Sequence, residues 1–385
     1  MQEYDFVMAG GGMAGLSLAH ALVTGRFSDR SILIVDPETK GENDRTWSYW
    51  TREQEPFDSV VSHAWSSIRI ASREWSADID LGEYRYCMIR GQDFYDRVLE
   101  DLENHPKVEF ERGAVSEIRN SDDHAEVVTE SRTVRAGWVF DSRFVPEEYE
   151  RRTGPHHYLK QHFLGWTIEI ERDVFDPSVA TLFDFRTPQH DEMRFVYVLP
   201  FSPRRALVEY TLFSADLLAD DEYVAALESY IDGVLGISEY RVVDREKGVI
   251  PMTDEPVERH EGSRTLAIGT RGGRVKASTG YAFRRTQKDT AAIVASLERN
   301  GHPFAIPAPP PRVHALDSTL LQVMYRRGEY SEKTFVNLFR KNPISRLLAF
   351  LDEETGLGQT IALMATVPIG VFLRAFWRTQ VLRKV

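Results

Sequence analysis

Cysteine is almost absent from this 385-residue chain, which contains only Cys87. An internal disulfide and a cysteine-rich zinc or iron–sulfur site are therefore excluded. Long apolar runs are also missing, and the mean hydropathy of -0.36 excludes a protein with several membrane spans. The first residues, Met1 to Asp5, have neither the basic nor the apolar region of a secretory signal, so we expect a cytoplasmic protein.

Positive charge is outnumbered, with 47 Lys and Arg against 59 Asp and Glu. The net charge of -12 argues against nucleic-acid binding, which requires a cationic surface. The eleven histidines show no metal-ligand spacing with carboxylates, so we predict no metal site. The content of 42% hydrophobic and 28% charged residues is that of a folded chain, and its length suggests two or three domains.

The C-terminal part has the opposite charge balance. Residues 321–385 carry ten Lys and Arg against five Asp and Glu, which leaves -17 for residues 1–320. Ile361 to Leu373 contains no charge and is followed by Arg374, but it is too short to span a bilayer. Two interpretations remain open: a last core helix with a solvated basic side, or a segment that binds an anionic lipid surface.

A βαβ unit is predicted at the N-terminus. A short apolar run from Tyr4 to Ala9 precedes three glycines, a helix-compatible stretch at 13–23 and a second apolar run at 31–36. From 163 to 213 the hydrophobic period changes to two, with a hairpin connection at 200–203, which indicates an antiparallel sheet. Helix starts are expected at Asp317 and at Asn342-Pro343.

We therefore predict an α/β fold in which a discontinuous, Rossmann-type domain alternates with an antiparallel β-sheet substrate domain. The first domain comprises 1–60, 85–150 and 245–300, and the second 61–84 and 151–244. A helical C-terminal region follows at 301–385.

The glycines of the βαβ unit fit the pattern G-x-G-x-x-G. Gly10 permits a tight turn, Gly12 lets the backbone approach a pyrophosphate, and Gly15 allows close packing of helix and strand. Asp36 ends the second strand 21 residues after Gly15, where an acidic residue accepts from a ribose hydroxyl. This context predicts a dinucleotide site but does not separate FAD from NAD.

A second glycine-rich strand end, Gly269 to Gly273, follows an apolar strand. If it lies beside the first, it contacts the far end of a long cofactor, which favours FAD. The alternative is a plain loop.

In these glycine-rich segments and in several other motifs, the chain resembles the FAD-dependent lycopene cyclases, a family within the aromatic-hydroxylase-like flavoproteins. The resemblance rests on several motifs in a fixed order: Gly-Gly-Gly-Met-Ala-Gly-Leu at 10–16, Asn-Asp-Arg-Thr-Trp-Ser-Tyr-Trp at 43–50, Phe-Asp-Phe-Arg at 183–186, Tyr-Val-Leu-Pro at 197–200, Leu-Val-Glu-Tyr-Thr at 207–211, Ile-Pro-Met at 250–252 and Ser-Thr-Gly-Tyr at 278–281. One departure is that Ala277 and Ser278 stand where the family often has a proline.

The resemblance implies an isomerase of the intramolecular lyase type that closes the linear ψ-ends of lycopene, or of a related linear carotenoid, to β-ionone rings. It implies dependence on reduced FAD, with NAD(P)H as external reductant, and a flavin loop that includes Thr279 and Gly280. It carries the catalytic acid over to Glu209, and further site positions to Asp44, Arg45 and Asp184.

Protonation of an alkene requires a carboxylic acid that burial keeps neutral. Strand alternation puts Glu209, Thr211 and Phe213 on one face, so Thr211 is a hydroxyl neighbour of the acid. Trp47, Trp50, Tyr197 and Phe213 are candidate π-faces for a carbocation. Trp47 and Trp50 are equally compatible with a core role, and Asp44-Arg45 with a local salt bridge.

Two other functions fit the same fold: a flavin-dependent monooxygenase and an isoprenoid reductase. A third alternative is a carrier that binds a lipid without chemistry. Because a carotenoid is insoluble in water, we also expect a peripheral location at the inner face of the cell membrane.

Overall fold

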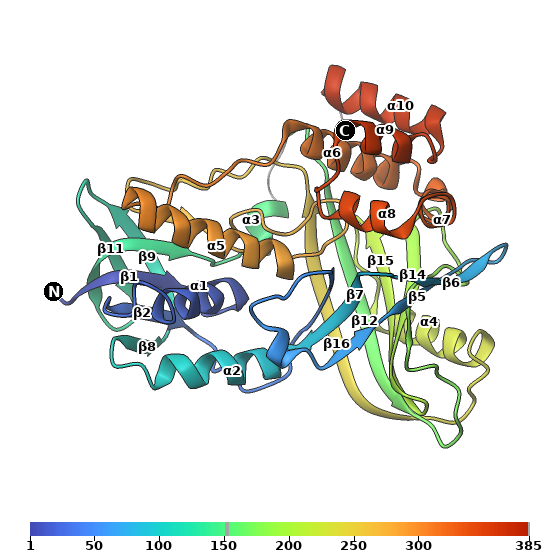
Figure 1. Cartoon of the computed structure of the whole chain (residues 1–385), viewed down its shortest axis with the longest axis horizontal. Coiled ribbons are helices and arrows are strands. Elements are labelled where there is room, and N and C mark those ends of the chain that lie inside the picture. The colour runs from blue at the N-terminus through green and yellow to red at the C-terminus, as the bar shows by residue number, and fades with distance from the viewer. Residues whose placement is uncertain (151–153, 384–385) are drawn as a thin grey trace.

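Two large sheets, each assembled from segments far apart in the chain, form the body of the protein (Figure 1). The computed structural model describes residues 1–150 and 154–383. The first sheet lies on the left of the view, near the N-terminus, and the second sheet lies on the right. The first sheet packs with helices α1 (Met13–Val23), α2 (Gly91–Glu103) and α5 (Phe283–Asn300). This arrangement confirms the predicted α/β class with a second sheet, which is antiparallel except for the parallel pair β13 and β5.

The first sheet has the strand order β8-β2-β1-β11-β10-β9, and β17 also pairs with β11. Strands β1, β2, β8, β11 and β17 pair in parallel, whereas β9 and β10 continue the sheet as an antiparallel extension. The bounds are β1 Glu3–Ala9, β2 Ile32–Asp36, β8 Val108–Arg112, β9 Val115–Asn120, β10 Ala125–Thr129, β11 Thr133–Asp141 and β17 Thr265–Ala267. The βαβ unit predicted from the sequence is thus β1-α1-β2.

The second sheet has the order β16-β12-β15-β14-β13-β5-β6. Its bounds are β5 Ser67–Ala71, β6 Ser76–Asp80, β12 Tyr158–Glu169, β13 Val179–Asp184, β14 Met193–Ser202, β15 Arg205–Ser214 and β16 Arg241–Thr253. Strands β14 and β15 form the hairpin expected from the sequence, and its turn lies at residues 203–204. One predicted boundary needs correction: residue 245 falls inside β16, so this stretch belongs to the second sheet and not to the first domain.

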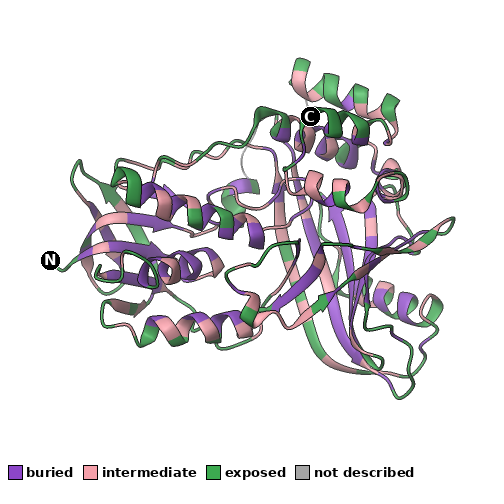
Figure 2. Cartoon of the chain, in the orientation of Figure 1, coloured by how far each residue is buried: buried purple, intermediate pink, exposed green. Residues whose placement is uncertain are grey.

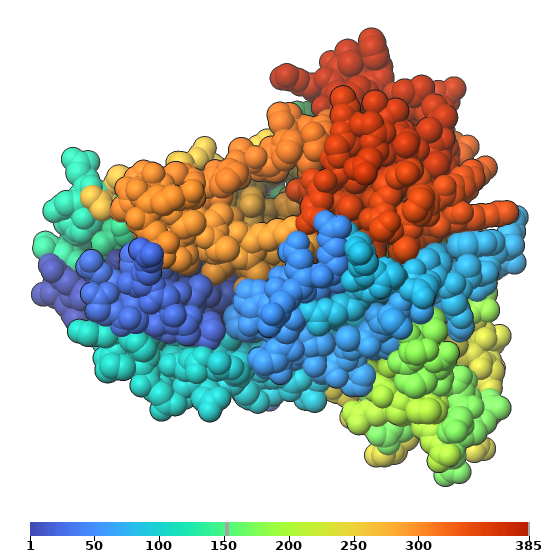
Figure 3. Space-filling view, viewed as in Figure 1, coloured from blue at the N-terminus to red at the C-terminus, as the bar shows by residue number. Residues whose placement is uncertain are grey.

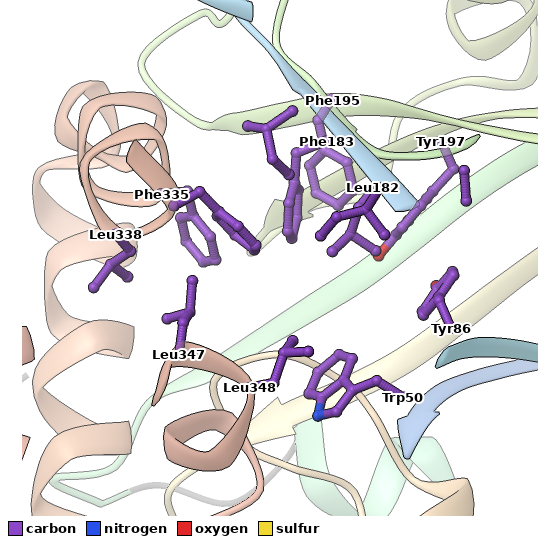
Figure 4. Close-up of a cluster of buried hydrophobic side chains, with 14 of the residues drawn as sticks. Trp50, Tyr86, Leu182, Phe183, Phe195, Tyr197, Phe335, Leu338, Leu347 and Leu348 are labelled. Carbon is purple, nitrogen blue, oxygen red and sulfur yellow. The ribbon is translucent and has the colours of Figure 1, made fainter. Parts of the chain in front are cut away.

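Alternation divides the second sheet into two apolar faces, because successive side chains of a strand point to opposite sides. Leu207 and Phe213 pack in one cluster with α7 (Ser331–Lys341) and α8 (Ile344–Leu351), as Figure 4 shows for its labelled members. Val208, Tyr210 and Leu212 pack on the other face against α4 (Asp220–Gly233). The first face is therefore the one that carries Glu209.

A small third sheet joins the two larger ones. It has the order β3-β7-β4, with β3 at Thr46–Thr51, β4 at His63–Trp65 and β7 at Arg85–Arg90. A short 3-10 turn at Asp58–Val60 lies between β3 and β4, and the short helix α3 occupies Pro146–Glu150.

The C-terminal region is helical, as expected, and caps one end of the second sheet (Figures 1 and 3). It comprises α6 Pro311–Arg326, a 3-10 turn at Gly328–Tyr330, α7, α8, α9 Leu357–Met364, α10 Ile369–Phe376 and a π-helical turn at Trp377–Val381. The expected start at Asn342-Pro343 is confirmed by α8, but the one at Asp317 is wrong. Helix α6 begins at Pro311, whose fixed φ suits the first helical position. Among the described residues, no helix is long and apolar enough to cross a membrane.

Candidate active site

A cavity of about 700 Å³ lies where the three sheets meet. One end is lined by residues of the β1–α1 turn, and the other by residues of the second sheet, including Glu209. The two predicted sites, for a dinucleotide and for acid chemistry, therefore open into one continuous space.

The dinucleotide end has the expected geometry. Gly15 packs directly on the turn, since a Cβ at this position would lie 2.1 Å from the Gly10 carbonyl oxygen. A Cβ on Gly12 would instead meet nothing within 4 Å, and no side chain caps the N-terminus of α1. The Asp36 carboxylate accepts from the Gly11 N–H at 2.6 Å and lines the cavity. The open approach at Gly12 and the uncapped helix end fit a pyrophosphate.

The second glycine-rich strand end lies beside the first, as predicted. Strand β17 pairs with β11, and Gly269 comes so close to α1 that a Cβ there would be 2.8 Å from the Ala14 Cβ. Gly269 lines the cavity, whereas Gly273 lies outward near Val257.

The predicted flavin loop also reaches the cavity. Thr279 and Gly280 line it, and a Cβ on Gly280 would lie 1.9 Å from Oε1 of Gln161 on β12. This loop therefore packs directly against β12 of the second sheet.

The acid end is organised as a row across four strands. Tyr197 on β14 is in register with Glu209 on β15, and Glu209 with Gly165 on β12. Gly165 is in turn in register with Glu246 on β16. Because residues in register across a sheet point to the same face, two carboxyls flank a glycine on the face of the cavity.

Glu209 has the environment of a neutral acid. Its side chain is buried, and the Thr211 hydroxyl donates to its Oε1 at 2.7 Å. Burial, and next the like charge and hydrogen bond of the Glu246 carboxyl, raise the pKa of Glu209 well above its usual range. Both effects favour the protonated, neutral form of Glu209.

Three tyrosines surround this acid. Tyr86 and Tyr281 lie with their hydroxyls 3.3 Å apart, and Tyr197 completes the group. All three line the cavity, and burial raises the pKa of each well above the usual range. Neutral phenol rings therefore face the space next to Glu209. Of these, only Tyr197 is among the π-faces predicted from the sequence.

The other predicted substrate residues lie in two places. Trp47 lines the cavity, packed edge-on against Phe94 with the ring centroids 5.4 Å apart. Trp50 and Phe213 lie in the apolar cluster behind the cavity wall, where Trp50 meets the Tyr281 ring at 4.7 Å. Thr211 is fully buried and reaches the site through its hydrogen bond to Glu209.

Asp184 does not reach the cavity, and its assignment to the substrate site is corrected. Its neighbours Phe183 and Phe185 stack in the apolar cluster, so Asp184 points away toward α4. There its carboxylate accepts from Tyr230 Oη at 2.7 Å and from the Arg186 guanidinium at 2.6 Å. These contacts give Asp184 a structural role.

Asp44 and Arg45 line the cavity as an ion pair of 3.5 Å. Their side chains are 36% and 61% exposed, which distinguishes this pair from the buried Glu209. The Tyr95 hydroxyl also interacts with the Asp44 carboxylate. Their assignment to catalysis remains a prediction.

Glu246, like Tyr86 and Tyr281, is a site residue that the sequence did not single out. The predicted boundary at residue 245 puts Glu246 in the first domain, whereas it lies on β16, which contains Pro251. Proline is compatible with an edge strand, which is what β16 is. Alternation within 241–253 was the signal that could have placed Glu246 on the face of Gly248 and Ile250.

The fold defines the class of protein. Solved structures that resemble it over nearly their whole length include a halogenase in complex with FAD, with a TM-score of 0.63, 11% identity and coverage of 98% of this chain and 92% of that chain. A flavoprotein/dehydrogenase from Cytophaga hutchinsonii gives a TM-score of 0.61 with 13% identity over 98% of this chain and 100% of that one. The chain thus has the fold of FAD-dependent flavoproteins.

Sequence comparison then defines the family. The model described as lycopene cyclase protein matches residues 5–376, so the chain belongs to the lycopene cyclase family. It is 25% identical to a lycopene beta-cyclase of a Paracoccus strain, over 76% of this chain and 74% of that protein. A chloroplastic lycopene beta cyclase of Arabidopsis thaliana is 26% identical, over 77% of this chain and 60% of that protein.

Proposed function

We propose that this protein is a lycopene β-cyclase that converts the linear ends of lycopene, or of a related linear carotenoid, to β-ionone rings. The observation that carries the proposal is Glu209, a buried acid in the same cavity as the glycine turn of β1–α1. Family membership and the names of the relatives support the substrate class.

The reaction requires a proton to reach an end alkene and another to leave the ring carbon, with no net change of redox state. Because Glu209 Oε1 accepts from Thr211, the acidic proton is on Oε2. The proton lost from the ring carbon restores the acid. The faces of Tyr86, Tyr197 and Tyr281 stabilise the intermediate cation through their π-electrons, and the apolar walls exclude water.

We further propose that the dinucleotide end holds FAD, through the β1–α1 turn, Asp36, Gly269 and the loop with Thr279 and Gly280. When bound in its reduced form, with NAD(P)H as external reductant, the flavin supplies electron density near the cation. The residues present fit this group, since the approach at Gly12 is open and Asp36 lines the same wall.

The direct test is expression in a bacterium that accumulates lycopene, followed by pigment chromatography and mass spectrometry. We expect cyclised products of unchanged mass, with one or two rings. Products two mass units heavier indicate an isoprenoid reductase. Oxygenated product with stoichiometric NADPH oxidation indicates a monooxygenase, and unchanged lycopene contradicts the proposal.

We also propose that the C-terminal helices bind the inner face of the cell membrane peripherally. Ile369, Leu373 and Trp377 follow one side of α10 and the next turn, and they are 52%, 63% and 58% exposed. Figure 2 shows much of the C-terminal helical region as exposed. The adjacent side carries Arg374 and Arg378. They line a small pocket together with Arg326, the last residue of α6, and Arg327, which follows it. Apolar side chains beside several arginines are complementary to an anionic lipid surface.

A second, smaller cavity lies beside the same helices. This apolar cavity of about 60 Å³ lies among α6–α10 and shares Thr279 with the main cavity. Phe372 faces this cavity, and Leu363 and Val367 are buried, so α9 and α10 are partly core. Removal of residues 360–385 would therefore also remove core side chains, and it would not test the membrane contact alone.

Point variants test the membrane contact more sharply. The double variant Leu373→Glu/Trp377→Glu is expected to reduce co-sedimentation with anionic liposomes at low salt by about tenfold or more, because two apolar side chains no longer enter the interface. High salt is expected to release part of the wild-type protein, since it screens the arginines. Phe110→Glu, on exposed β8, is the matched control and should sediment like wild type. Equal sedimentation of all three proteins would place the contact elsewhere.

A further inference from the structure

Gly165 lets two carboxyl groups approach each other across the central strand of the site. It is in register with both Glu209 and Glu246. A Cβ at this position would lie 2.9 Å from Glu246 Cγ and 3.1 Å from its Oε1. Any other residue here would therefore displace the Glu246 side chain.

The contacts of Glu246 show which state this pair adopts. Thr46 Oγ1 donates to Glu246 Oε2 at 2.6 Å, whereas Oε1 is buried and has no donor in the described structure. Two carboxylates are acceptors only, so a hydrogen bond between them needs one proton. A proton on Glu209 satisfies Glu246 Oε1 and removes the repulsion between two buried charges.

The pKa of each carboxyl is raised, and the causes favour Glu209 as the member that keeps the proton. The Glu246 carboxyl raises the pKa of Glu209, in addition to burial. Burial also raises the pKa of Glu246, but its hydrogen bonds with Glu209 and Thr46 oppose this effect. Because Glu246 Oε1 is a buried acceptor without a donor, a proton on Glu209 and a negative charge on Glu246 satisfy both groups.

We propose that Glu246 is a positioning residue. Its carboxylate accepts a hydrogen bond from protonated Glu209 and so keeps that acid in its protonated, neutral form at neutral pH. This proposal rests on the function proposed above. When Glu209 gives its proton to the alkene carbon, both carboxyls are ionised and face the cation. The pair regains one proton when the ring carbon loses its own, so protons and electrons balance.

Few other titratable groups act on this pair. Tyr86 from β7, Tyr197 from β14 and Tyr281 from the flavin loop lie near Glu209, but burial keeps them neutral. On β16 the Asp244 carboxylate acts on Glu246, whereas Lys247 contacts Asp220 and the Tyr223 ring of α4. A shift in the pH profile therefore reports on the pair itself.

The first test is the variant Glu246→Gln in the flavin-loaded protein. Wild-type cyclisation is expected to fall as pH rises through the pKa of Glu209. In the variant the Glu209 pKa drops because its charged neighbour is gone, so this fall should occur at least one pH unit lower. An unchanged pH profile would overturn the proposal.

A direct readout does not depend on turnover. Infrared titration of the purified holoenzyme follows the C=O stretch of a protonated carboxyl, which should disappear in Glu209→Gln and titrate at lower pH in Glu246→Gln. If wild type fails to cyclise lycopene, the proposed function fails, yet this titration still tests the pair. A carboxyl signal that is insensitive to Glu246→Gln contradicts the pairing.

Gly165→Ala tests the geometry while both carboxyls are kept. The added methyl group displaces Glu246, so the pH profile should shift in the same direction as in Glu246→Gln. Gly233→Ala at the end of α4 is the control, since a Cβ there meets nothing within 4 Å. Flavin absorbance and thermal melting show whether each variant is folded. A folded Gly165→Ala variant with the wild-type profile would contradict the proposal.

Discussion

Glu209→Gln is expected to lower the rate of ring formation by about 10²–10⁴, the usual contribution of a general acid. Glutamine keeps the size of the side chain and its acceptor for the Thr211 hydroxyl, but it has no carboxylic proton to deliver. Flavin content and thermal stability should stay near wild type. The measurement is the conversion of lycopene by purified protein, followed by pigment chromatography.

A matched control for this variant is Glu169→Gln. Glu169 lies at the far end of β12, where it pairs with Arg205 and Arg241 at the surface. Its conversion rate should equal that of wild type. Substantial β-ring product from Glu209→Gln would remove Glu209 from the mechanism and direct attention to Asp44.

The second large effect is expected for Gly12→Val, which should abolish visible flavin binding while the protein stays folded. Gly12 has φ of -78° and ψ of -175°, a conformation that any residue adopts, and its Cβ would meet no protein atom. The valine side chain would occupy only the space through which the pyrophosphate approaches. The measurement is the flavin absorbance of purified protein, with circular dichroism as the check on folding.

Gly233→Val serves as the control, because Gly233 is equally uncrowded but lies at the end of α4. It should retain normal flavin absorbance. A folded Gly12→Val variant with full flavin content would show that the β1–α1 turn is not the pyrophosphate site.

The parts that the sequence predicted correctly are those that depend on local signals. The β1-α1-β2 unit has its strand run, glycine turn and helix within one short segment, so tertiary contacts need not be known. Alternation in β15 correctly placed Glu209, Thr211 and Phe213 on one face, because the side-chain period of a strand is two.

The errors arose where tertiary context decides. Every residue of β13 is buried, so polarity does not reveal which face Asp184 occupies. The same alternation that worked for β15 turns Asp184 away from Phe183 and Phe185, toward Tyr230. For Glu246, nothing local shows that β16 pairs with β12, since the two strands are joined only through long intervening segments.

The pairing of β1 with β11, and of β11 with β17, makes the first sheet depend on segments that are synthesised late. Both walls of the dinucleotide end depend on late segments: Gly269 lies against Ala14, and Gln287 donates to the Ser17 hydroxyl across 270 residues. While the ribosome is still translating the second sheet, α1 lacks its neighbour α5 and keeps an apolar side uncovered. Non-local contacts of this kind slow folding and prolong exposure to aggregation. The dinucleotide end is therefore complete only after α5 has been synthesised, so stable cofactor binding follows the synthesis of both large sheets.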